Sequence, residues 1–369
     1  MKLLIATPLY PPEIGGPATY AKLLQEGLPG KGIEVEIVKF SDVRHLPKLI
    51  RHYVYYHRVL KAARHADVVL ALDPVSVGLP ALYAAKKAGK PFVVKVVGDY
   101  AWEQGRQRFG VTQELDDFVQ TPQKSFFVRR LQEIQTRVAR SATRVVVPSE
   151  YLKNVVLKWG ISRNKIQVIY NAVSIEKMTE DVPESVKALP RPRVVTIGRL
   201  VEWKGIDGLI RVFDGLWAAR SRGLSASLVI VGMGPEEKRL KEHAALLRLN
   251  NVCLFTGQLS HEETLAIMND ADIFVLNSTY EGLSHTLIEA LMLGKCIIAT
   301  NAGGNPEIIL KGDGILINVK DETELASSLR ILIEHQERRL KFSKHAKESA
   351  KRFSLETMLL RTAMALQNL

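Results

Sequence analysis

The sequence Glu281-Gly-Leu-Ser-His-Thr-Leu-Ile-Glu289 places two carboxylates on either side of a short polar turn. It follows an apolar run, Ile273 to Leu276, whose length and composition predict a buried strand. It leads into Leu287 to Leu293, which has the apolar spacing of a helix. We therefore expect Glu281 on a strand-to-helix loop and Glu289 inside the helix that follows.

The turn between these carboxylates has the features of an anion site. Gly282 allows the backbone to approach a ligand closely. The first unpaired amides of the predicted helix lie near Leu283 to His285 and favour an anion. A carboxylate can accept hydrogen bonds from both hydroxyls of a vicinal diol. A nucleotide sugar, which carries a diol on either side of its diphosphate, matches this arrangement.

The wider pattern Tyr280-Glu-Gly-Leu-Ser…Ile288-Glu-Ala-Leu…Gly294-Lys resembles the retaining glycosyltransferases of family 4. The resemblance covers nearly the whole chain and is densest from Val194 to Asp321. It implies the GT-B fold, an α/β architecture in which two Rossmann-like domains with parallel sheets face each other across a cleft. Predicted strands and helices alternate through both halves of the chain, as such sheets require.

A polar, proline-containing stretch at residues 180–192 predicts the linker between the two domains. We expect an acceptor-binding domain at residues 1–182 and a nucleotide-sugar-binding domain at 193–354. The resemblance implies that the last helix, within 355–369, packs back on the first domain. A chain of 369 residues is long enough for two domains with separate cores.

Two cations follow a predicted strand at residues 193–198, namely Arg199 and Lys204. Ligands bind beyond the carboxyl ends of parallel strands, so these cations can neutralise charge on a departing nucleoside diphosphate. The pattern Gly-Arg-Leu…Lys-Gly also matches family 4. The resemblance implies catalytic roles for Arg199, Lys204 and Glu281, and donor contacts from Gly282, Leu283, Ser284 and Glu289.

Two further candidates lie in the first half. Gly15 and Gly16 have no side chains, so their amides can face a ligand. They resemble the family's loop that touches the donor diphosphate or sugar, with a tight strand-to-helix turn as the alternative. Asp99 follows an apolar run and can act catalytically by orienting the acceptor or donor sugar, or it can cap the next turn. Many relatives carry His near this position, so the acceptor-side chemistry stays open.

Two short patterns bear on metal and cofactor use. Asp270-Ala-Asp272 resembles the metal-binding pair of the other large glycosyltransferase fold, but it precedes a strand, so we expect a turn and cap and no metal site. Gly232-x-Gly234 lacks the third glycine of a dinucleotide fingerprint, because position 237 is Glu. We expect no cofactor, only a nucleoside diphosphate sugar as donor substrate, with UDP or GDP as its nucleotide.

The net charge of +12 is uneven, with 28 basic against 18 acidic residues in positions 1–190. Residues 44–64 have the spacing of a basic amphipathic helix. This spacing fits either an ordinary solvated face or contact with an anionic membrane surface. No nucleic-acid-binding motif accompanies the charge, so we expect no nucleic-acid partner.

The cysteine positions and the apolar runs bear on location. Cys253 and Cys296 lie in apolar runs, which indicates buried thiols in a reducing compartment. The sequence has no signal peptide and no apolar run near the roughly 20 residues that span a bilayer. We expect a cytoplasmic protein, either free or peripheral on the inner face of the membrane.

These observations predict a metal-independent, retaining hexosyltransferase that moves a sugar from a nucleoside diphosphate sugar to a glycan or lipid-linked acceptor. A nucleotide-sugar epimerase of the same fold, acting on the donor alone, is the main alternative. An NAD-dependent dehydrogenase is disfavoured by the missing glycine. A catalytically silent sugar-nucleotide binder is disfavoured by the intact set Arg199, Lys204, Glu281 and Glu289.

Overall fold

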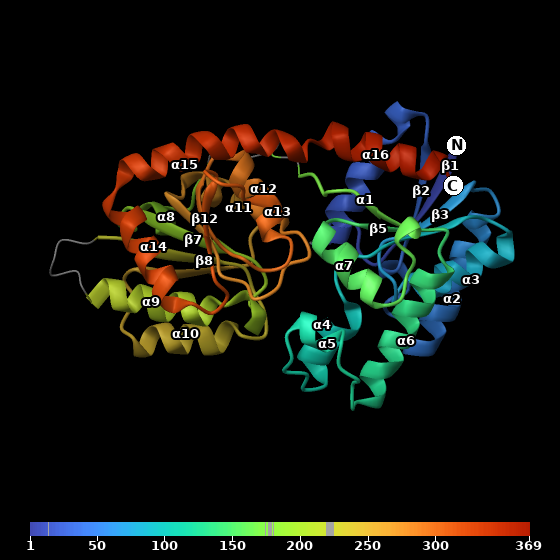
Figure 1. Ribbon diagram of the computed structural model, residues 1–369, viewed down its shortest axis with the longest axis horizontal. Helices are drawn as coiled ribbons and strands as arrows, with labels where there is room; N and C mark the ends of the chain where they lie inside the picture. Colours follow the sequence, from blue (N-terminus) through green and yellow to red (C-terminus); the bar gives the residue numbers. More distant parts are fainter. Residues whose placement is uncertain (14, 174, 176–178, 180, 219–224) are drawn as a thin grey trace. The chain divides into compact units, whose positions relative to one another are not determined.

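The computed structural model describes residues 1–13, 15–173, 175, 179, 181–218 and 225–369. The chain divides into two compact units, one formed by Met1–Asn171 with Leu355–Leu369 and the other by Ala172–Ser354 (Figure 1). The first unit ends at Asn171, before the expected boundary at 182, and it includes the last helix. Residue 180, the first of the predicted linker, lies outside the described residues.

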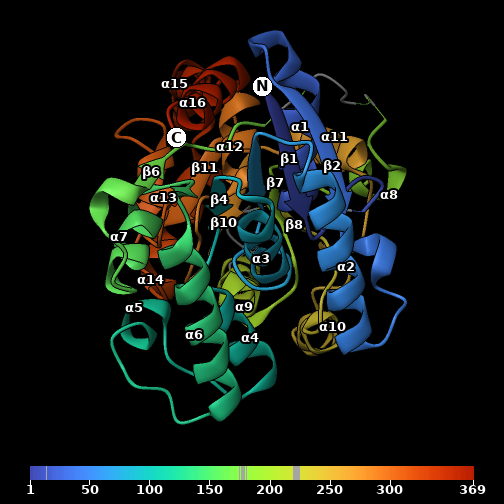
Figure 2. The ribbon, with the colours of Figure 1, turned by 90° about the vertical axis from the view of Figure 1, so that its right-hand side faces the viewer.

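The first unit contains a parallel six-stranded sheet in the order β2-β1-β3-β4-β5-β6. Its strands are β1 (Lys2–Thr7), β2 (Glu34–Lys39), β3 (Val68–Ala71), β4 (Phe92–Lys95), β5 (Arg144–Val147) and β6 (Ile166–Val168). Its helices are α1 (Gly16–Gly27), α2 (Lys48–Ala63), α3 (Gly78–Ala88), α4 (Tyr100–Arg108), α5 (Leu115–Phe118), α6 (Phe126–Ser141), α7 (Glu150–Lys158) and α16 (Leu355–Gln367). Figure 2 shows α2, α3 and α6 side by side along this unit.

The strand order of the first unit reverses between β1 and β3. Strand β2 lies on one side of β1, and all later strands lie on the other. In open parallel sheets, ligands bind at such a switch point, beyond the carboxyl ends of the strands. The loops after β1 and β3 therefore border a candidate binding region in this unit.

Two helices of the first unit begin later than their sequence spacing predicts. Helix α2 begins at Lys48, behind Pro47, and not at residue 44. Helix α3 begins at Gly78, whereas the sequence from Pro74 to Ala88 predicts a helix over the whole stretch. The reason for the second delay is Asp73, whose Oδ1 accepts the amides of Val75 and Ser76 at 2.6 Å each. This local turn competes with helix formation.

The second unit contains another parallel six-stranded sheet, in the order β12-β11-β10-β7-β8-β9. Its strands are β7 (Arg193–Ile197), β8 (Ser227–Val231), β9 (Cys253–Gly257), β10 (Ile273–Leu276), β11 (Cys296–Thr300) and β12 (Gly314–Ile317). Its helices are α8 (Glu184–Lys187), α9 (Ile206–Ala218), α10 (Glu237–Leu246), α11 (His261–Asp270), α12 (His285–Met292), α13 (Asn305–Ile308), α14 (Glu322–Glu334) and α15 (Gln336–Ser349). The order reverses between β7 and β10, so the switch point lies there.

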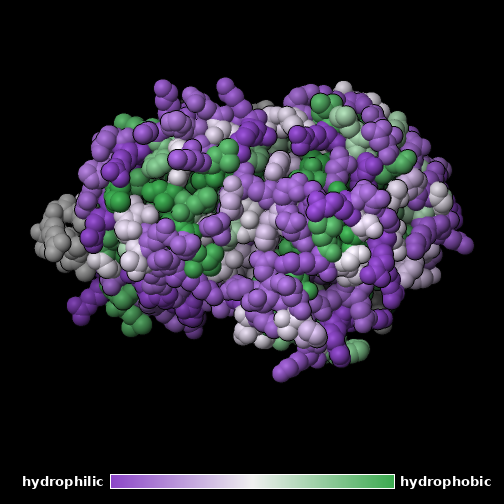
Figure 3. Space-filling model, viewed as in Figure 1, coloured by the Kyte–Doolittle hydropathy of each residue, from purple (hydrophilic) through white to green (hydrophobic). Residues whose placement is uncertain are grey.

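The central strands of this sheet are buried along their whole length. Every residue of β7, β8, β10 and β11 is buried, as expected for a parallel sheet covered on both faces. Helix α9 packs Leu209, Ile210 and Phe213 into the same core. A rigid sheet of this kind holds the loops at its carboxyl edge in fixed positions. The surface in Figure 3 is mostly hydrophilic, with apolar residues in separate patches.

Serine side chains cap the starts of two helices, as is typical of this residue type. Ser149 caps α7 by accepting the amide of Leu152 at 3.1 Å. Ser260 and Glu263 form a reciprocal capping box at the start of α11. Helix α16 packs on the first unit, where Leu359 fills the space that a Cβ on Gly27 would need.

Lys95 is an unusual core residue of the first unit. Only 2% of it is exposed, and its ammonium has no hydrogen-bond partner among the described residues. The Nζ atom lies 3.8 Å from the centroid of the Tyr20 ring, a cation–π contact. Burial lowers the pKa of Lys95 to about 7.

This burial predicts a pH-dependent stability that Lys95→Met removes. Between pH 7 and 10, the unfolded chain holds a proton at Lys95 that the folded protein has lost, so the free energy of unfolding rises with pH. We expect Lys95→Met to gain at least ~1 kcal/mol at pH 7 and to show a flatter pH profile in urea unfolding. The exposed Lys87→Met serves as the control. Parallel profiles for wild type and Lys95→Met would contradict the prediction.

Candidate functional site

The loops after β7 and β10 are joined at the switch point of the second unit. Lys204 Nζ lies 2.6 Å from Glu281 Oε1. The amide of Thr279 donates to the carbonyl of Trp203 at 2.7 Å, and Asn277 Nδ2 donates to the carbonyl of Gly205 at 2.8 Å. One ion pair and two hydrogen bonds thus hold the two loops together where a ligand is expected.

Gly205 is required at this junction for two reasons. Its φ of 63° lies in the left-handed region that favours glycine. A Cβ built there would lie 2.0 Å from the carbonyl oxygen of Asn277. The Lys-Gly sequence is therefore a local packing requirement that also brings Lys204 next to Glu281.

Glu281 sits in a polar setting that sequence reasoning identified only in part. Ser278 Oγ donates to the same Oε1 atom at 2.6 Å, and Ser278 itself is fully buried. The sequence analysis did not single out Ser278, although a serine directly after a buried strand is a usable signal. Lys204 and Ser278 together fix the position of the carboxylate.

The loop after β11 supports Glu281 from the other side. The amide of Gly304 donates to the carbonyl of Glu281 at 2.9 Å. A Cβ on Gly303, whose φ is 56°, would lie 1.9 Å from the same oxygen. The Gly303-Gly304 pair therefore allows one loop to pack directly against the backbone of another.

The second cation, Arg199, lies one residue beyond Gly198 and is exposed. It forms no ion pair with any side chain in the part of the chain that the structure describes. Lys204 lies beside the same strand end, since a Cβ on Gly198 would be 3.7 Å from its Nζ. The end of β7 therefore presents two cations, one paired with a carboxylate and one available to an anion.

The amides expected to face an anion lie at the start of α12. Ser284 caps this helix, with its Oγ accepting the amide of Leu287 at 3.3 Å. Leu283 and Ser284 are buried, and the carbonyl of Gly282 lies against Gly304. The strand-to-helix loop predicted around Glu281 is thus present.

Glu289 lies within α12, as predicted, and is buried. Its Oε1 atom is 3.7 Å from Nε2 of His261, which begins α11. Burial raises the pKa of Glu289 to about 8. Among the described ion pairs it joins neither Lys204 nor Arg199, so the structure places it apart from the Lys204–Glu281 contact. A buried acid of this kind ionises readily only when hydrogen-bond donors reach it.

In the first unit, Gly15 and Gly16 begin helix α1. Gly15 is the N-cap residue with a φ of 154°, and its carbonyl accepts the amides of Ala18 and Thr19. A Cβ on Gly16 would meet no atom within 4 Å, so the space around this helix start is open within its unit. Residue 14 lies outside the described residues. Donor contact by these two glycines stays a prediction.

Asp99 has the helix-capping role that the sequence analysis gave as one of its two alternatives. Its Oδ1 caps α4 by accepting the amide of Trp102 at 2.9 Å. Its Oδ2 accepts Trp159 Nε1 at 3.1 Å, and only 1% of the residue is exposed. Burial raises the pKa of Asp99, and these hydrogen bonds oppose the rise. Both oxygens accept hydrogen bonds within the unit, so Asp99 is a buried helix cap, and its catalytic role stays a prediction.

The two patterns weighed against other functions have structural roles. Asp270 and Asp272 pair with Arg191 and Arg193 at the start of β10, the edge opposite the switch-point loops. A Cβ on Gly232 would lie 2.1 Å from the carbonyl of Gly198. Gly232 thus serves the packing of the loop that carries Arg199.

Comparisons with known proteins match both halves of the chain. The family model "Glycosyltransferase Family 4" matches residues 14–177, and the model "Glycosyl transferases group 1" matches residues 177–349. Anabaena HepE, solved with UDP and glucose, superimposes with a TM-score of 0.77 over 100% of both chains at 20% identity.

Two curated relatives match part of the chain. An uncharacterized glycosyltransferase of Methanocaldococcus jannaschii is 31% identical over 58% of this chain and 55% of its own length. An N-acetylgalactosamine-N,N'-diacetylbacillosaminyl-diphospho-undecaprenol 4-alpha-N-acetylgalactosaminyltransferase of Campylobacter jejuni is 26% identical over 55% of this chain and 53% of its own. The chain thus matches about half the length of each.

The two family models together span residues 14–349, each over one Rossmann-like half. With two parallel α/β sheets and a GT-B neighbour that matches end to end, the chain belongs to the family 4 glycosyltransferases of GT-B fold.

Proposed function

We propose that this protein transfers a sugar from a nucleoside diphosphate sugar to a glycan or lipid-linked acceptor, with retention at the anomeric carbon and without a metal. The Lys204–Glu281 contact at the switch point of the second unit is the observation that carries the proposal. A cation and a carboxylate held together there can bind the two parts of one donor. Lys204 can form an ionic contact with the diphosphate, and Glu281 can accept hydrogen bonds from hydroxyls of the transferred sugar.

Each residue of this site has a chemical role in the proposal. Arg199 and Lys204 bind the diphosphate and offset the negative charge that grows as it departs. Glu281 accepts hydrogen bonds from the donor sugar, beside the amides of Gly282 to Ser284. Glu289 accepts hydrogen bonds from the ribose hydroxyls. The departing phosphate oxygen takes the proton of the acceptor hydroxyl, because the site has no evident protein nucleophile.

Relatives support the donor and acceptor classes. HepE has been solved with UDP and glucose, and the Campylobacter relative is named for a lipid-linked acceptor. UDP and GDP are the nucleotides we propose for this chain. The epimerase alternative finds no favouring observation. A thermal-shift panel of UDP-, GDP- and ADP-sugars tests the proposal, because a bound donor raises the melting temperature by mass action. No shift with any sugar nucleotide would contradict it.

A membrane contact is proposed for the outer face of α2. Tyr53 is exposed there, next to the exposed cations Arg58, Lys61 and Arg64. Aromatic rings beside cations fit an anionic lipid surface. In the described part of the chain, no helix is long and apolar enough to cross a bilayer.

Lys204→Ala should lower turnover more than donor affinity. Its ammonium is placed to meet charge that grows only as the diphosphate departs, so the loss should be about 10²–10³-fold in kcat. The measurement is release of nucleoside diphosphate from the donor that gives the largest thermal shift. Lys238→Ala, at an exposed position of α10, is the matched control. Wild-type turnover in Lys204→Ala would remove Lys204 from the mechanism.

Donor binding should release a proton from Glu289. The hydroxyls of ribose favour the ionised carboxylate, whereas burial favours the neutral acid with a pKa of about 8. Affinity should therefore rise as pH increases toward 8 and level off above it. Calorimetry in buffers of different ionisation enthalpy would detect the proton, and Glu289→Gln should abolish its release. An unchanged release in Glu289→Gln would assign the proton to another group.

Reversing charge on the outer face of α2 should weaken binding to anionic vesicles. Each cation near such a surface contributes about 1 kcal/mol, so Arg58→Glu with Lys61→Glu should lower partitioning by roughly tenfold or more. Vesicle sedimentation with phosphatidylglycerol is the measurement, and Lys238→Glu is the control for net charge. Equal partitioning of the α2 double variant and the wild type would end the membrane proposal.

A further inference from the structure

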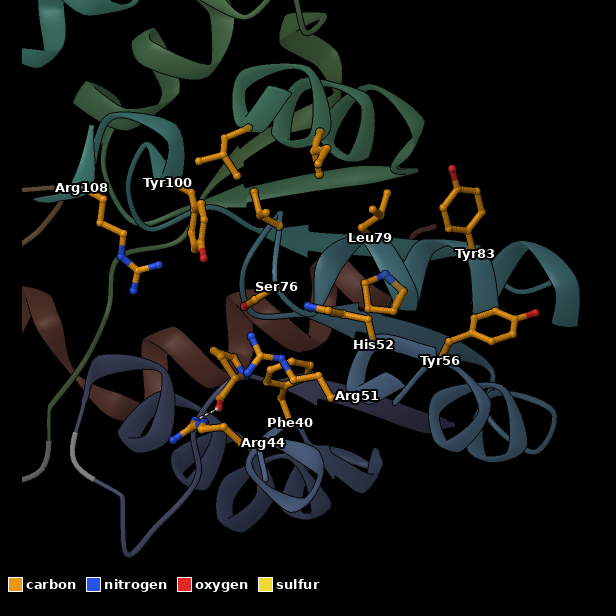
Figure 4. A pocket seen from close by; sticks show the side chains of 15 residues that line it. Phe40, Arg44, Arg51, His52, Tyr56, Ser76, Leu79, Tyr83, Tyr100 and Arg108 are labelled. Atoms are coloured by element: carbon orange, nitrogen blue, oxygen red, sulfur yellow. Dashed lines mark hydrogen bonds between the residues drawn. The ribbon is translucent and has the colours of Figure 1, made fainter. Parts of the chain in front are cut away.

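A cavity of about 660 Å³ lies in the first unit, at the carboxyl edge of its sheet (Figure 4). Its walls include loop residues that follow β1, β2 and β3, such as Pro8, Phe40 and Ser76. These loops surround the switch point between β1 and β3, where an open parallel sheet binds ligands. The volume is within the roughly 300–1,000 Å³ of typical small-molecule sites. The position and size of the cavity therefore indicate a binding site.

One part of this cavity is cationic. Arg44, Arg51 and Arg108 line it together with Tyr100 and Ser76, and Figure 4 shows all five toward the same end. Arg44 is held by Glu13 at 2.8 Å and by the carbonyl of Pro8 at 3.0 Å. It therefore brings little uncompensated charge.

The other two arginines have no such compensation. Neither Arg51 nor Arg108 forms an ion pair within the described residues. The buried Nε of Arg51 has no hydrogen-bond partner there. Burial, and next the charge of Asp73, raise the pKa of Tyr100, while the charges of Arg108 and Arg51 oppose the rise. Both arginines are thus close enough to affect the Tyr100 phenol electrostatically. Their positive charges are available to bind an anion.

Asp73 forms no ion pair with these arginines in the described part of the chain. Its oxygens accept hydrogen bonds from the amides of Val75 and Ser76 and from the Ser76 hydroxyl. Burial raises the pKa of Asp73, and these hydrogen bonds oppose the rise. Burial and the neighbouring Arg51 lower the pKa of His52. Arg51 and Arg108 are therefore the lining cations that have no carboxylate partner among the described residues.

Apolar side chains also line the cavity. They belong to Leu79 and Pro80 of α3 and to Leu131 and Ile134 of α6, and the ring of Tyr83 lines it as well. Figure 4 shows Leu79, Tyr56 and Tyr83 away from the end that holds Arg108. A neutral sugar or a free nucleotide would leave this wall facing water. A hydrocarbon chain would cover it, with about 0.8 kcal/mol of transfer free energy for each buried CH₂.

We propose that this cavity is the acceptor site of the proposed transferase and takes an amphiphilic phosphate. Arg51 and Arg108 bind the phosphate, and the hydrocarbon chain lies between α3 and α6 along Leu79, Leu131 and Ile134. The inference rests on the proposed function, since it names the class of acceptor. The same chemistry is shared by a prenyl phosphate carrier and by a glycerophospholipid, so the test must separate the two.

The test is calorimetric binding of four probes to the full chain below their micelle concentrations. Farnesyl phosphate and dioctanoyl phosphatidic acid carry both features, whereas inorganic phosphate and farnesol carry one each. We expect at least one of the amphiphilic phosphates to bind about tenfold or more tighter than both single-feature probes. Preference for farnesyl phosphate indicates a carrier lipid, and preference for phosphatidic acid indicates a bilayer lipid. Equal or undetectable binding of all four probes overturns the proposal.

Two sets of variants locate the site. Arg51→Gln with Arg108→Gln should reduce binding of the amphiphilic phosphate to the level of farnesol. Leu131→Asn with Ile134→Asn should reduce it to the level of inorganic phosphate. Lys87→Gln with Arg130→Gln is the control. These exposed cations lie on α3 and α6, outside the cavity lining, and their replacement should change nothing.

The donor-induced thermal shift is measured on each protein as the independent readout. A normal donor shift without amphiphile binding defeats the acceptor proposal alone, and loss of the donor shift in the wild type defeats the proposed function. Unchanged amphiphile binding in both cavity variants also overturns this inference.

Discussion

The ion pair between Lys204 and Glu281 determines the geometry of the candidate site. It joins the loops after β7 and β10, the neighbouring strands at which the sheet order reverses. The two opposite charges lie 2.6 Å apart, and each can also interact with a ligand. A diphosphate can bind to the ammonium, and a sugar hydroxyl can donate a hydrogen bond to the carboxylate. In the proposed function, this one contact therefore supplies a group for the diphosphate and a group for the transferred sugar.

Glycines make this contact possible. Gly205 and Gly303 each occupy a place where a Cβ would collide with a backbone carbonyl of the adjoining loop, that of Asn277 or that of Glu281. Three loops from three strands can therefore pack at backbone distance. The buried strands β7, β10 and β11 hold the starts of those loops in register. The close backbone packing that these glycines allow therefore also brings Lys204 and Glu281 together.

Much of the second unit was predictable, because its signals are local. The apolar run before Glu281 and the helical spacing after it predict the strand, loop and helix that the structure shows. The resemblance to family 4 implied catalytic roles for Lys204 and Glu281, and the structure adds the direct contact between them. Ser278 was missed because its role depends on a contact with a carboxylate three residues away. Asp99 was ambiguous because capping and catalysis both place an acid directly after a strand, and only the structure shows its partners Trp102 and Trp159.

The cavity of the first unit was beyond sequence reasoning for a physical reason. Arg51 and Arg108 are far apart in the chain, on α2 and at the end of α4, and only the folded sheet edge brings them to one cavity. The periodicity of residues 44–64 described one helix as basic and amphipathic, without showing that its charges divide between a cavity and an outer face. The two units then differ in the chemistry of their sheet edges, with a paired lysine and glutamate in the second unit and two arginines without carboxylate partners among the described residues in the first.

Hydrogen exchange of backbone amides with and without a saturating sugar nucleotide tests the central claim most directly. The account predicts slowed exchange in residues 199–205 and 278–284, the two loops joined by Lys204 and Glu281. Slowed exchange confined to other segments, with residues 199–205 and 278–284 unchanged, would show that the ion pair at the switch point does not bind the donor.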